Sequence, residues 1–190
     1  MMMNLVLLLL LGFFQRDLLS PLPDANRQQL TIIDGGKARP YEHTTFDAGP
    51  AAGDGLNGHF FPAVIAYNTG RYNLALVDFT YMIGRPQYLD GNPRKAEFLS
   101  ICHYLRGMIY LYHAKGVGQH ALAKADFEAS IDWNPVNHLA YLELSRVYSD
   151  LGFTKEAIPV IQHLLELKPP QDIADEAEQE LKKLSESSPN

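Results

Sequence analysis

The chain contains a single cysteine and few basic residues, and both shortages exclude whole classes of function. Because Cys102 is alone among 190 residues, no intramolecular disulfide and no cysteine-based zinc site can form. We expect Cys102 to be a small buried side chain on a helix. The formal net charge of −6 argues against a binder of nucleic-acid phosphates, which needs a basic face. Apolar residues still make up 46% of the chain, so most of it should fold around a core.

Patterns typical of catalytic, metal or nucleotide sites are also missing. None of the seven histidines forms a His-Glu-x-x-His motif, and none has a second histidine three or four residues away. His113 and His120 bracket an expected surface turn, where we prefer a structural role to a metal site. The glycine-rich residues 47–58 lack the Gly-Lys-Ser/Thr of a phosphate loop, and Asp47 and Asp54 lack the spacing of a calcium loop. The sequence therefore predicts no cofactor, no metal and no enzyme.

The carboxylates show no arrangement that would favour acid–base chemistry. Asp126 and Asp132 lie on one expected helix with Lys124 nearby, and a surface role is the simplest interpretation. The acidic residues between 172 and 180 are expected to solvate the outer face of a terminal helix. No Ser-His-Asp set can be proposed from the sequence.

The longest apolar run extends from Leu5 to Phe14. It is too short for an ordinary membrane span, which needs about 20 apolar residues. Its length fits the apolar core of a secretory signal, although no Lys or Arg precedes it and no small-x-small cleavage pattern follows. We interpret residues 1–19 as a signal peptide or an uncleaved anchor, which would make the protein exported (periplasmic or extracellular) or membrane-associated. A retained apolar arm that packs on protein is the alternative.

Residues 20–57 are expected to form an extended connector. Prolines at four positions forbid long helices, and glycines supply turns. A linker, or an arm that becomes ordered on a partner, fits this composition.

Two apolar stripes at helical spacing follow each other between His138 and Pro169. They are separated by a glycine at position 152, which predicts two antiparallel helices joined by a tight turn. The first stripe comprises Tyr141, Leu144, Ser145, Tyr148 and Leu151, and the second comprises Ala157, Ile161, Leu164 and Leu165.

This segment resembles a tetratricopeptide repeat. The family pattern of an aromatic residue, Leu-Gly, Tyr, a turn glycine, Ala, an aromatic residue and a closing Pro extends over 34 residues. The matching residues here are Tyr141, Leu144, Tyr148, Gly152, Ala157 and Pro169. Ser145 takes the small position and Ile161 the second aromatic position. Pro159 departs from the pattern, because it removes a backbone donor early in the second helix and should bend it.

Two further copies precede this one. Residues 93–135 contain Arg106-Gly107-x-x-Tyr110 and Ala123-x-x-x-Phe127, with about four extra residues in the turn, and Asn92-Pro93 is expected to cap and begin the first helix. A degraded copy covers residues 58–85, and an amphipathic segment at 171–185 fits a capping helix. The resemblance therefore implies an all-α, helical-hairpin solenoid over residues 58–190, with a C-terminal capping helix and an extended N-terminal arm.

The resemblance implies a non-enzymatic scaffold or assembly subunit that binds protein, and the net charge of −6 argues against nucleic acid as a partner. In such a stack the first helix of each hairpin lines a groove that takes a partner segment. The expected groove is apolar and aromatic, and only Arg146 and Asn68 suit the grip on a C-terminal carboxylate for which the family is best known. The groove residues would be Phe60, Val64, Tyr67, Asn68, Tyr104, Met108, Leu111, Tyr112, Leu142, Arg146 and Ser149.

Other interpretations remain open at this point. A register shifted by one residue would place some of the groove residues in the core. The protein could self-assemble into a homo-oligomeric ring or filament by exchanging its own N-terminal arm. It could also be an accessory subunit of a membrane enzyme complex, held there through the run from Leu5 to Phe14.

Overall fold

The computed structural model describes residues 33–34, 37–38, 56–115 and 118–187. The chain divides into two compact units, Met1–Gly49 and Pro50–Asn190. In the first unit the described residues form a small antiparallel hairpin of β1 (Ile33–Asp34) and β2 (Lys37–Ala38), with Ile33 opposite Ala38. The apolar run from Leu5 to Phe14 and nearly all of the predicted connector lie outside the described residues.

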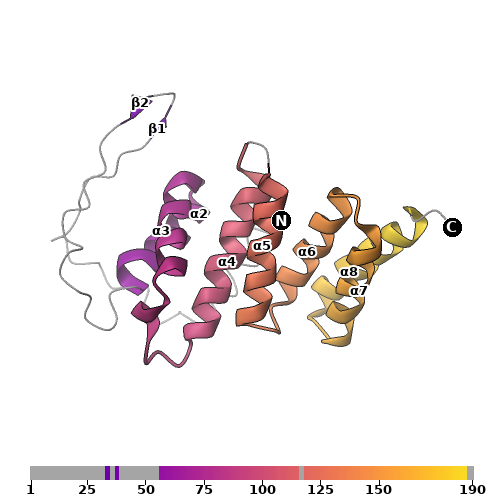
Figure 1. The fold of residues 1–190 in the computed structure, drawn as a ribbon. Helices are drawn as coiled ribbons and strands as arrows, with labels where there is room; N and C mark the ends of the chain where they lie inside the picture. Colours follow the sequence, from indigo (N-terminus) through magenta and orange to yellow (C-terminus); the bar gives the residue numbers. More distant parts are fainter. Residues whose placement is uncertain (1–32, 35–36, 39–55, 116–117, 188–190) are drawn as a thin grey trace. The chain divides into compact units, whose positions relative to one another are not determined.

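The second unit is helical over its described residues 56–115 and 118–187, so the all-α prediction is confirmed for it. After a π-helical turn, Leu56–Phe60, come α2 (Phe61–Asn68), α3 (Tyr72–Gly84), the short 3-10 helix Pro86–Leu89, α4 (Lys95–Tyr112), α5 (Gln119–Trp133), α6 (His138–Asp150), α7 (Thr154–Glu166) and α8 (Gln171–Ser187). Each α-helix packs against the next one in the chain, and α8 also contacts α6 (Figure 1).

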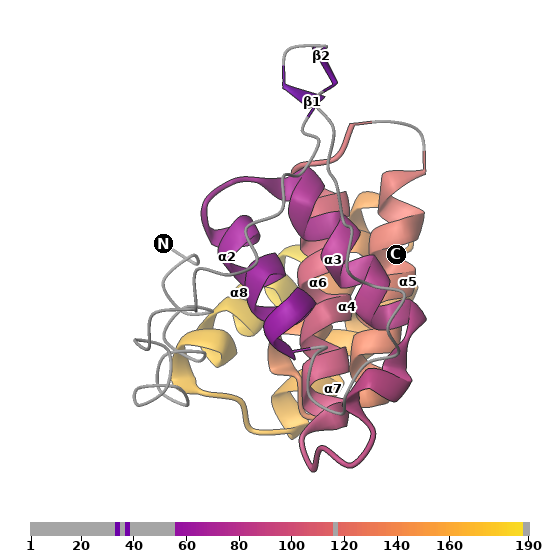
Figure 2. The same ribbon diagram turned by 90° about the vertical axis from the view of Figure 1, so that its left-hand side faces the viewer.

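The helices fall into three hairpins followed by one terminal helix. The pairs α2–α3, α4–α5 and α6–α7 lie within the predicted repeat ranges 58–85, 93–135 and 136–169. Figure 2 shows α2 and α8 toward one side of this unit and α3 and α5 toward the other. We refer to α2, α4, α6 and α8 as the inner helices.

A glycine in left-handed conformation occurs at the turn of each hairpin. The φ angles of Gly70, Gly118 and Gly152 are +74°, +87° and +81°. Side chains with a Cβ rarely adopt this conformation, and glycine does so without steric cost. The same local rule therefore closes all three hairpins, including the one with the longer turn between α4 and α5.

The helix–helix contacts are made by small residues between larger apolar ones. Ser145 and Ala157, predicted to lie where two helices come closest, are fully buried, and so is Ala63 in the first hairpin. Cys102 is also fully buried, as predicted. Leu151 differs from its prediction: α6 ends at Asp150, and the Leu151 side chain is 38% exposed in the turn.

The ends of two helices differ in detail from the sequence-based expectations. The helix predicted to begin at Asn92-Pro93 begins at Lys95, and the Asn92 side chain instead accepts a hydrogen bond from the Arg94 amide in the preceding turn, at 2.9 Å. The apolar stripe predicted for the terminal helix comprises Ile173, Ala177, Leu181 and Leu184. In α8, Ile173, Ala177 and Leu184 are buried, whereas Leu181 is half-buried and Glu180 is also buried. None of the described helices is both long and apolar enough to cross a membrane.

Candidate functional site

Polar and aromatic side chains from all four inner helices meet in one group, which we call the tyrosine–carboxylate cluster. The three tyrosines of the cluster come from α2 and α4. The helix α6 contributes a carboxylate and a guanidinium, and α8 contributes a second carboxylate. Its members are Tyr67, Tyr104, Tyr112, Glu143, Arg146 and Glu176.

Glu143 is the centre of the cluster. The hydroxyl of Tyr112 donates a hydrogen bond to Glu143 Oε2 at 2.6 Å, and Arg146 Nη1 donates to Glu143 Oε1 at 2.7 Å. Arg146 Nη2 donates to Glu176 Oε2 at 2.9 Å. These bonds connect α4, α6 and α8, so the cluster joins two hairpins to the terminal helix.

Local helix geometry brings these groups together. Residues three apart on a helix lie on the same face, which places Arg146 beside Glu143 on α6. The packing of α8 against α6 then delivers Glu176 to the second side of the guanidinium. Tyr112 is the last residue of α4, so its ring extends from a helix end toward the next hairpin.

Burial dominates the electrostatics of Glu143, which is 1% exposed. Burial raises its pKa, although Arg146 and the Tyr112 hydroxyl favour the ionised form and act in the opposite direction. Burial would lower the pKa of Arg146, but its attraction to Glu143 and Glu176 outweighs burial and raises that pKa. Two carboxylates therefore share one permanently charged guanidinium.

The three tyrosines keep their protons at physiological pH. Burial raises the pKa of Tyr67 to about 12, and the charges of Tyr72 and Glu143 add to the effect. Burial also raises the pKa values of Tyr104 and Tyr112, again with a contribution from Glu143. Their hydroxyls can therefore act as hydrogen-bond donors beside the carboxylates.

The predicted groove residues fall into three groups by exposure. The buried group consists of Phe60, Tyr104, Met108, Leu111 and Leu142. The half-buried group consists of Val64, Tyr67, Asn68, Arg146 and Ser149. Tyr112 is 51% exposed. Phe60 packs edge-to-face on Phe98, with ring centroids 4.8 Å apart, which is a core contact. That these residues bind a partner stays a prediction.

Arg146 does not offer a free cation for a carboxylate ligand. Arg146 was predicted to be a groove residue, and no partner was predicted for it. In the structure it pairs with both Glu143 and Glu176. Glu143 itself was missed by the sequence analysis. The signal available was a glutamate between Leu142 and Leu144, inside an apolar stretch, with an arginine three residues later.

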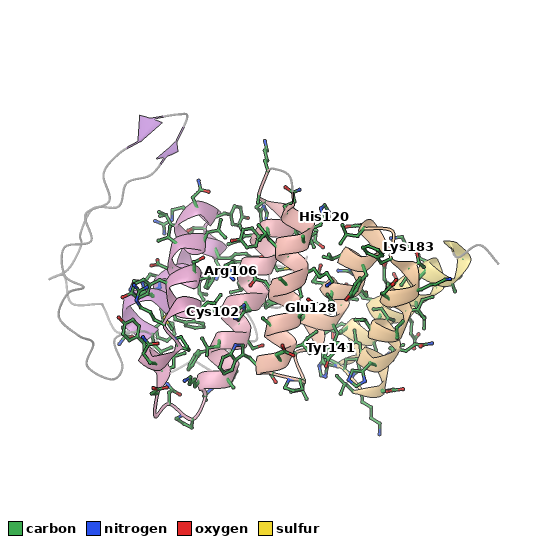
Figure 3. All side chains as sticks on the ribbon, viewed as in Figure 1. Cys102, Arg106, His120, Glu128, Tyr141 and Lys183 are labelled. Carbon is green, nitrogen blue, oxygen red and sulfur yellow. The ribbon has the colours of Figure 1, made fainter. Side chains whose placement is uncertain are left out.

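The prediction that Asp126 is a surface residue is wrong. Asp126 is 3% exposed, and its Oδ1 lies 2.8 Å from His103 Nδ1. Arg106 donates to both of its carboxylate oxygens, at 2.8 and 2.7 Å. Figure 3 shows Arg106 on α4, with Cys102 one turn before it. The physical reason is that α5 turns this face toward α4, while Asp132 on the same helix is exposed.

The first hairpin contains a related histidine–aspartate pair. His59 Nδ1 lies 2.7 Å from Asp78 Oδ1, and both side chains are buried. The two partners are 19 residues apart here and 23 apart in the pair of His103 and Asp126. The difference of four residues equals the extra length predicted for the turn between α4 and α5. Equivalent spacing between histidine and aspartate in the two hairpins was therefore a signal from which both pairs could have been predicted.

The two histidines that bracket the turn between α4 and α5 have separate neighbours. His113 stacks on Tyr72, with ring centroids 3.7 Å apart. His120 Nε2 lies 3.8 Å from Asp150 Oδ2. Among residues 56–115 and 118–187, no three histidine, cysteine or carboxylate side chains gather in a way that could hold a metal ion.

Comparison with protein families finds a match in the third hairpin. Residues 138–171 match the family model described as the tetratricopeptide repeat, and this range begins with α6 and ends at the first residue of α8. A solved structure similar to this chain is the first TPR of Spaghetti (RPAP3) bound to HSP90 peptide SRMEEVD, with 20% identity, coverage of 68% of this chain and 97% of that chain, and a TM-score of 0.49. No curated protein matches the chain. The third hairpin of this chain therefore contains a tetratricopeptide repeat.

Proposed function

We propose that this chain is a protein–protein interaction scaffold, and that its inner helices bind a segment of a partner protein. The proposal rests on Tyr112, whose ring is exposed while its hydroxyl is held by a hydrogen bond. Half of its surface is exposed, yet its hydroxyl is fixed on the buried carboxylate of Glu143. Stacked helical repeats commonly use the surface of their inner helices for binding.

An aromatic ring held in this way is well suited to a binding surface. Tyrosine buries a large area on association and is enriched among the residues that dominate interface energies. Because the hydrogen bond to Glu143 already restricts the ring, less conformational freedom is lost when a partner packs on it. Half-buried Val64, Tyr67 and Asn68 from α2 extend the surface that such a partner would contact.

The proposal involves neither catalysis nor a cofactor. Tyr112, Glu143, Arg146 and Glu176 are hydrogen-bonded to one another, as in a preformed binding surface. A site of acid–base chemistry would instead need a group poised to exchange a proton with a substrate. The tetratricopeptide repeat is in general an interaction module, which supports the same conclusion.

Co-purification from the source cells tests the proposal. The tagged full-length chain should retain a stoichiometric partner, and Tyr112→Ala should release that partner. Phe153→Ala is the matched control, because Phe153 is similarly exposed, at 50%, but lies in the turn before α7. If both variants retain the partner, or both lose it while remaining folded, the inner-helix surface is not the binding site.

Self-assembly through the N-terminal arm is a second proposal, favoured by the apolar run from Leu5 to Phe14. If one subunit's arm covers the inner helices of the next, deletion of residues 1–19 should reduce the assembly to monomers in light-scattering measurements. An unchanged mass after the deletion would contradict arm exchange. An apolar run of this kind also fits export or membrane association, which N-terminal sequencing of the natural protein would test.

A further inference from the structure

We propose that the tyrosine–carboxylate cluster selects a partner segment that carries a lysine or arginine next to apolar side chains, and disfavours acidic segments. This inference rests on the proposed function and names the chemistry of the partner.

The cations of the first three inner helices are already paired. The helix α2 contains no charged residue. On α4, Lys95 lies 2.6 Å from Asp90, and Arg106 is bonded to Asp126. On α6, Arg146 lies between Glu143 and Glu176. Within the described residues of these helices, each lysine and arginine therefore has a carboxylate partner.

The carboxylates, in contrast, exceed the cations. Glu143 and Glu176 share the single positive charge of Arg146, which leaves the cluster with an excess of negative charge when both are ionised. The side chain of Glu176 is 39% exposed. The negative charge continues along α8, because no lysine or arginine occurs in this helix before Lys182.

An acidic segment would meet two penalties at this surface. Its carboxylates would be repelled by Glu176, which solvent reaches. To bind them, Arg146 would also have to leave Glu143, and a buried carboxylate without its partner is strongly destabilising. The arrangement therefore disfavours a ligand that binds through its carboxylates, because such a ligand needs an unpaired arginine.

A segment with one cation among apolar residues meets neither penalty. Its apolar side chains can pack on the exposed ring of Tyr112 and on half-buried Val64 and Tyr67. The aliphatic stem of a lysine or the plane of an arginine can lie against a tyrosine ring while the charge faces Glu176. Opposite potentials on the two sides of an interface provide specificity of this kind.

The test uses the full-length chain as bait for a phage-displayed library of random dodecapeptides. Enriched sequences should combine a lysine or arginine with neighbouring aromatic or aliphatic residues. One enriched peptide is then synthesised with a fluorophore, and its dissociation constant is measured by anisotropy. We expect Glu176→Gln and Tyr112→Ala each to weaken its binding about tenfold, the size of a substantial interface contact.

Glu178→Gln is the matched control. It removes the same charge from an exposed position two residues along α8, on another face of the helix, and should leave the dissociation constant unchanged. Tyr112→Phe keeps the ring and removes the hydroxyl, so it should reduce the affinity for the peptide less than Tyr112→Ala does. Thermal unfolding of each variant shows whether the fold persists.

The outcomes separate this inference from the proposed function. Enrichment of acidic or uncharged peptides whose binding depends on Tyr112 would overturn the charge preference and leave the inner-helix site in place. Enriched peptides whose binding depends on neither Tyr112 nor Glu176 would contradict both proposals, and so would a library without enrichment. A basic, apolar peptide that depends on both residues supports both.

Discussion

Gly107 on α4 lies directly against the ring of Phe127 on α5, so closely that a Cβ built on the glycine would be 2.8 Å from Phe127 Cε1. Such a distance is far below van der Waals contact. The packing of α4 against α5 at this point therefore depends on the absence of a side chain at position 107, and the facing ring of Phe127 is fully buried.

Gly107→Ala should destabilise the protein by about 1–3 kcal/mol, the usual cost of inserting a methyl group into a packed core. Urea unfolding followed by circular dichroism measures the change. Gly84→Ala is the control, because nothing lies within 4 Å of a Cβ at that helical position. Its free energy of unfolding should be unchanged or slightly higher. Equal effects of the two substitutions would mean that the contact with Phe127 does not restrict position 107.

Asn137 joins the second hairpin to the start of the third. Its amide nitrogen donates to Ser100 Oγ and Ser130 Oγ, at 3.1 and 2.9 Å, and its oxygen accepts from the Ala140 amide at the start of α6. Asn137→Ala removes these bonds from a buried network and should cost about 1–2 kcal/mol. Asn134→Ala, which removes one exposed bond to the Val136 amide, should cost less. Comparable melting temperatures for the two variants would show that the network adds little.

Asp126→Asn tests the buried ion pair in the second hairpin. The substitution leaves Arg106 without its charged partner and should cost about 3–5 kcal/mol, the range for breaking a buried pair from one side. Asp132→Asn changes an exposed residue of the same helix and should alter stability by less than about 0.5 kcal/mol. Denaturant unfolding of the two variants gives the comparison. A small effect at position 126 would contradict the role assigned to this pair.

Glu143 should make stability depend on pH in a defined direction. Because burial raises its pKa in the folded protein, the folded state binds this proton more tightly than the unfolded chain does. Protonation of Glu143 therefore stabilises the folded state at low pH. This stabilisation is lost as the pH rises from near the ordinary pKa of 4.5 through the raised pKa.

The measurement is the free energy of unfolding of the native chain and of Glu143→Gln as pH is raised. The difference, native minus variant, should decrease with rising pH across that window, because glutamine does not ionise. A difference that is constant or increases would show that the pKa of Glu143 is not raised in the folded state.

The helices themselves were largely predictable, because they follow from local spacing. Ser145, Ala157 and Ile161 repeat at helical intervals around Gly152, and all three are fully buried in the structure. Leu151 fits the same interval but lies past the last residue of α6, so periodicity alone assigned it wrongly to the buried face. Where a helix ends depends on the turn that follows, which spacing within the helix does not specify.

The polar contacts were less predictable, because they join residues far apart in the chain. Tyr112 and Glu143 are 31 residues apart, and Arg146 and Glu176 are 30 apart. Their pairing depends on how successive hairpins are placed, and a single sequence gives no measure of that placement. Asp126 was misassigned for the same reason, since its burial depends on which face of α5 meets α4.

Site-specific photo-crosslinking tests the central claim most directly. In one preparation a photoreactive phenylalanine derivative, which keeps an aromatic ring at the site, replaces Tyr112 on the inner-helix surface. In the other preparation it replaces Val77, which is 54% exposed on α3. If partners bind the inner helices, position 112 should give a discrete adduct that an excess of unlabelled chain competes away, and position 77 should give none. A competed adduct at position 77 with none at position 112 would contradict the account.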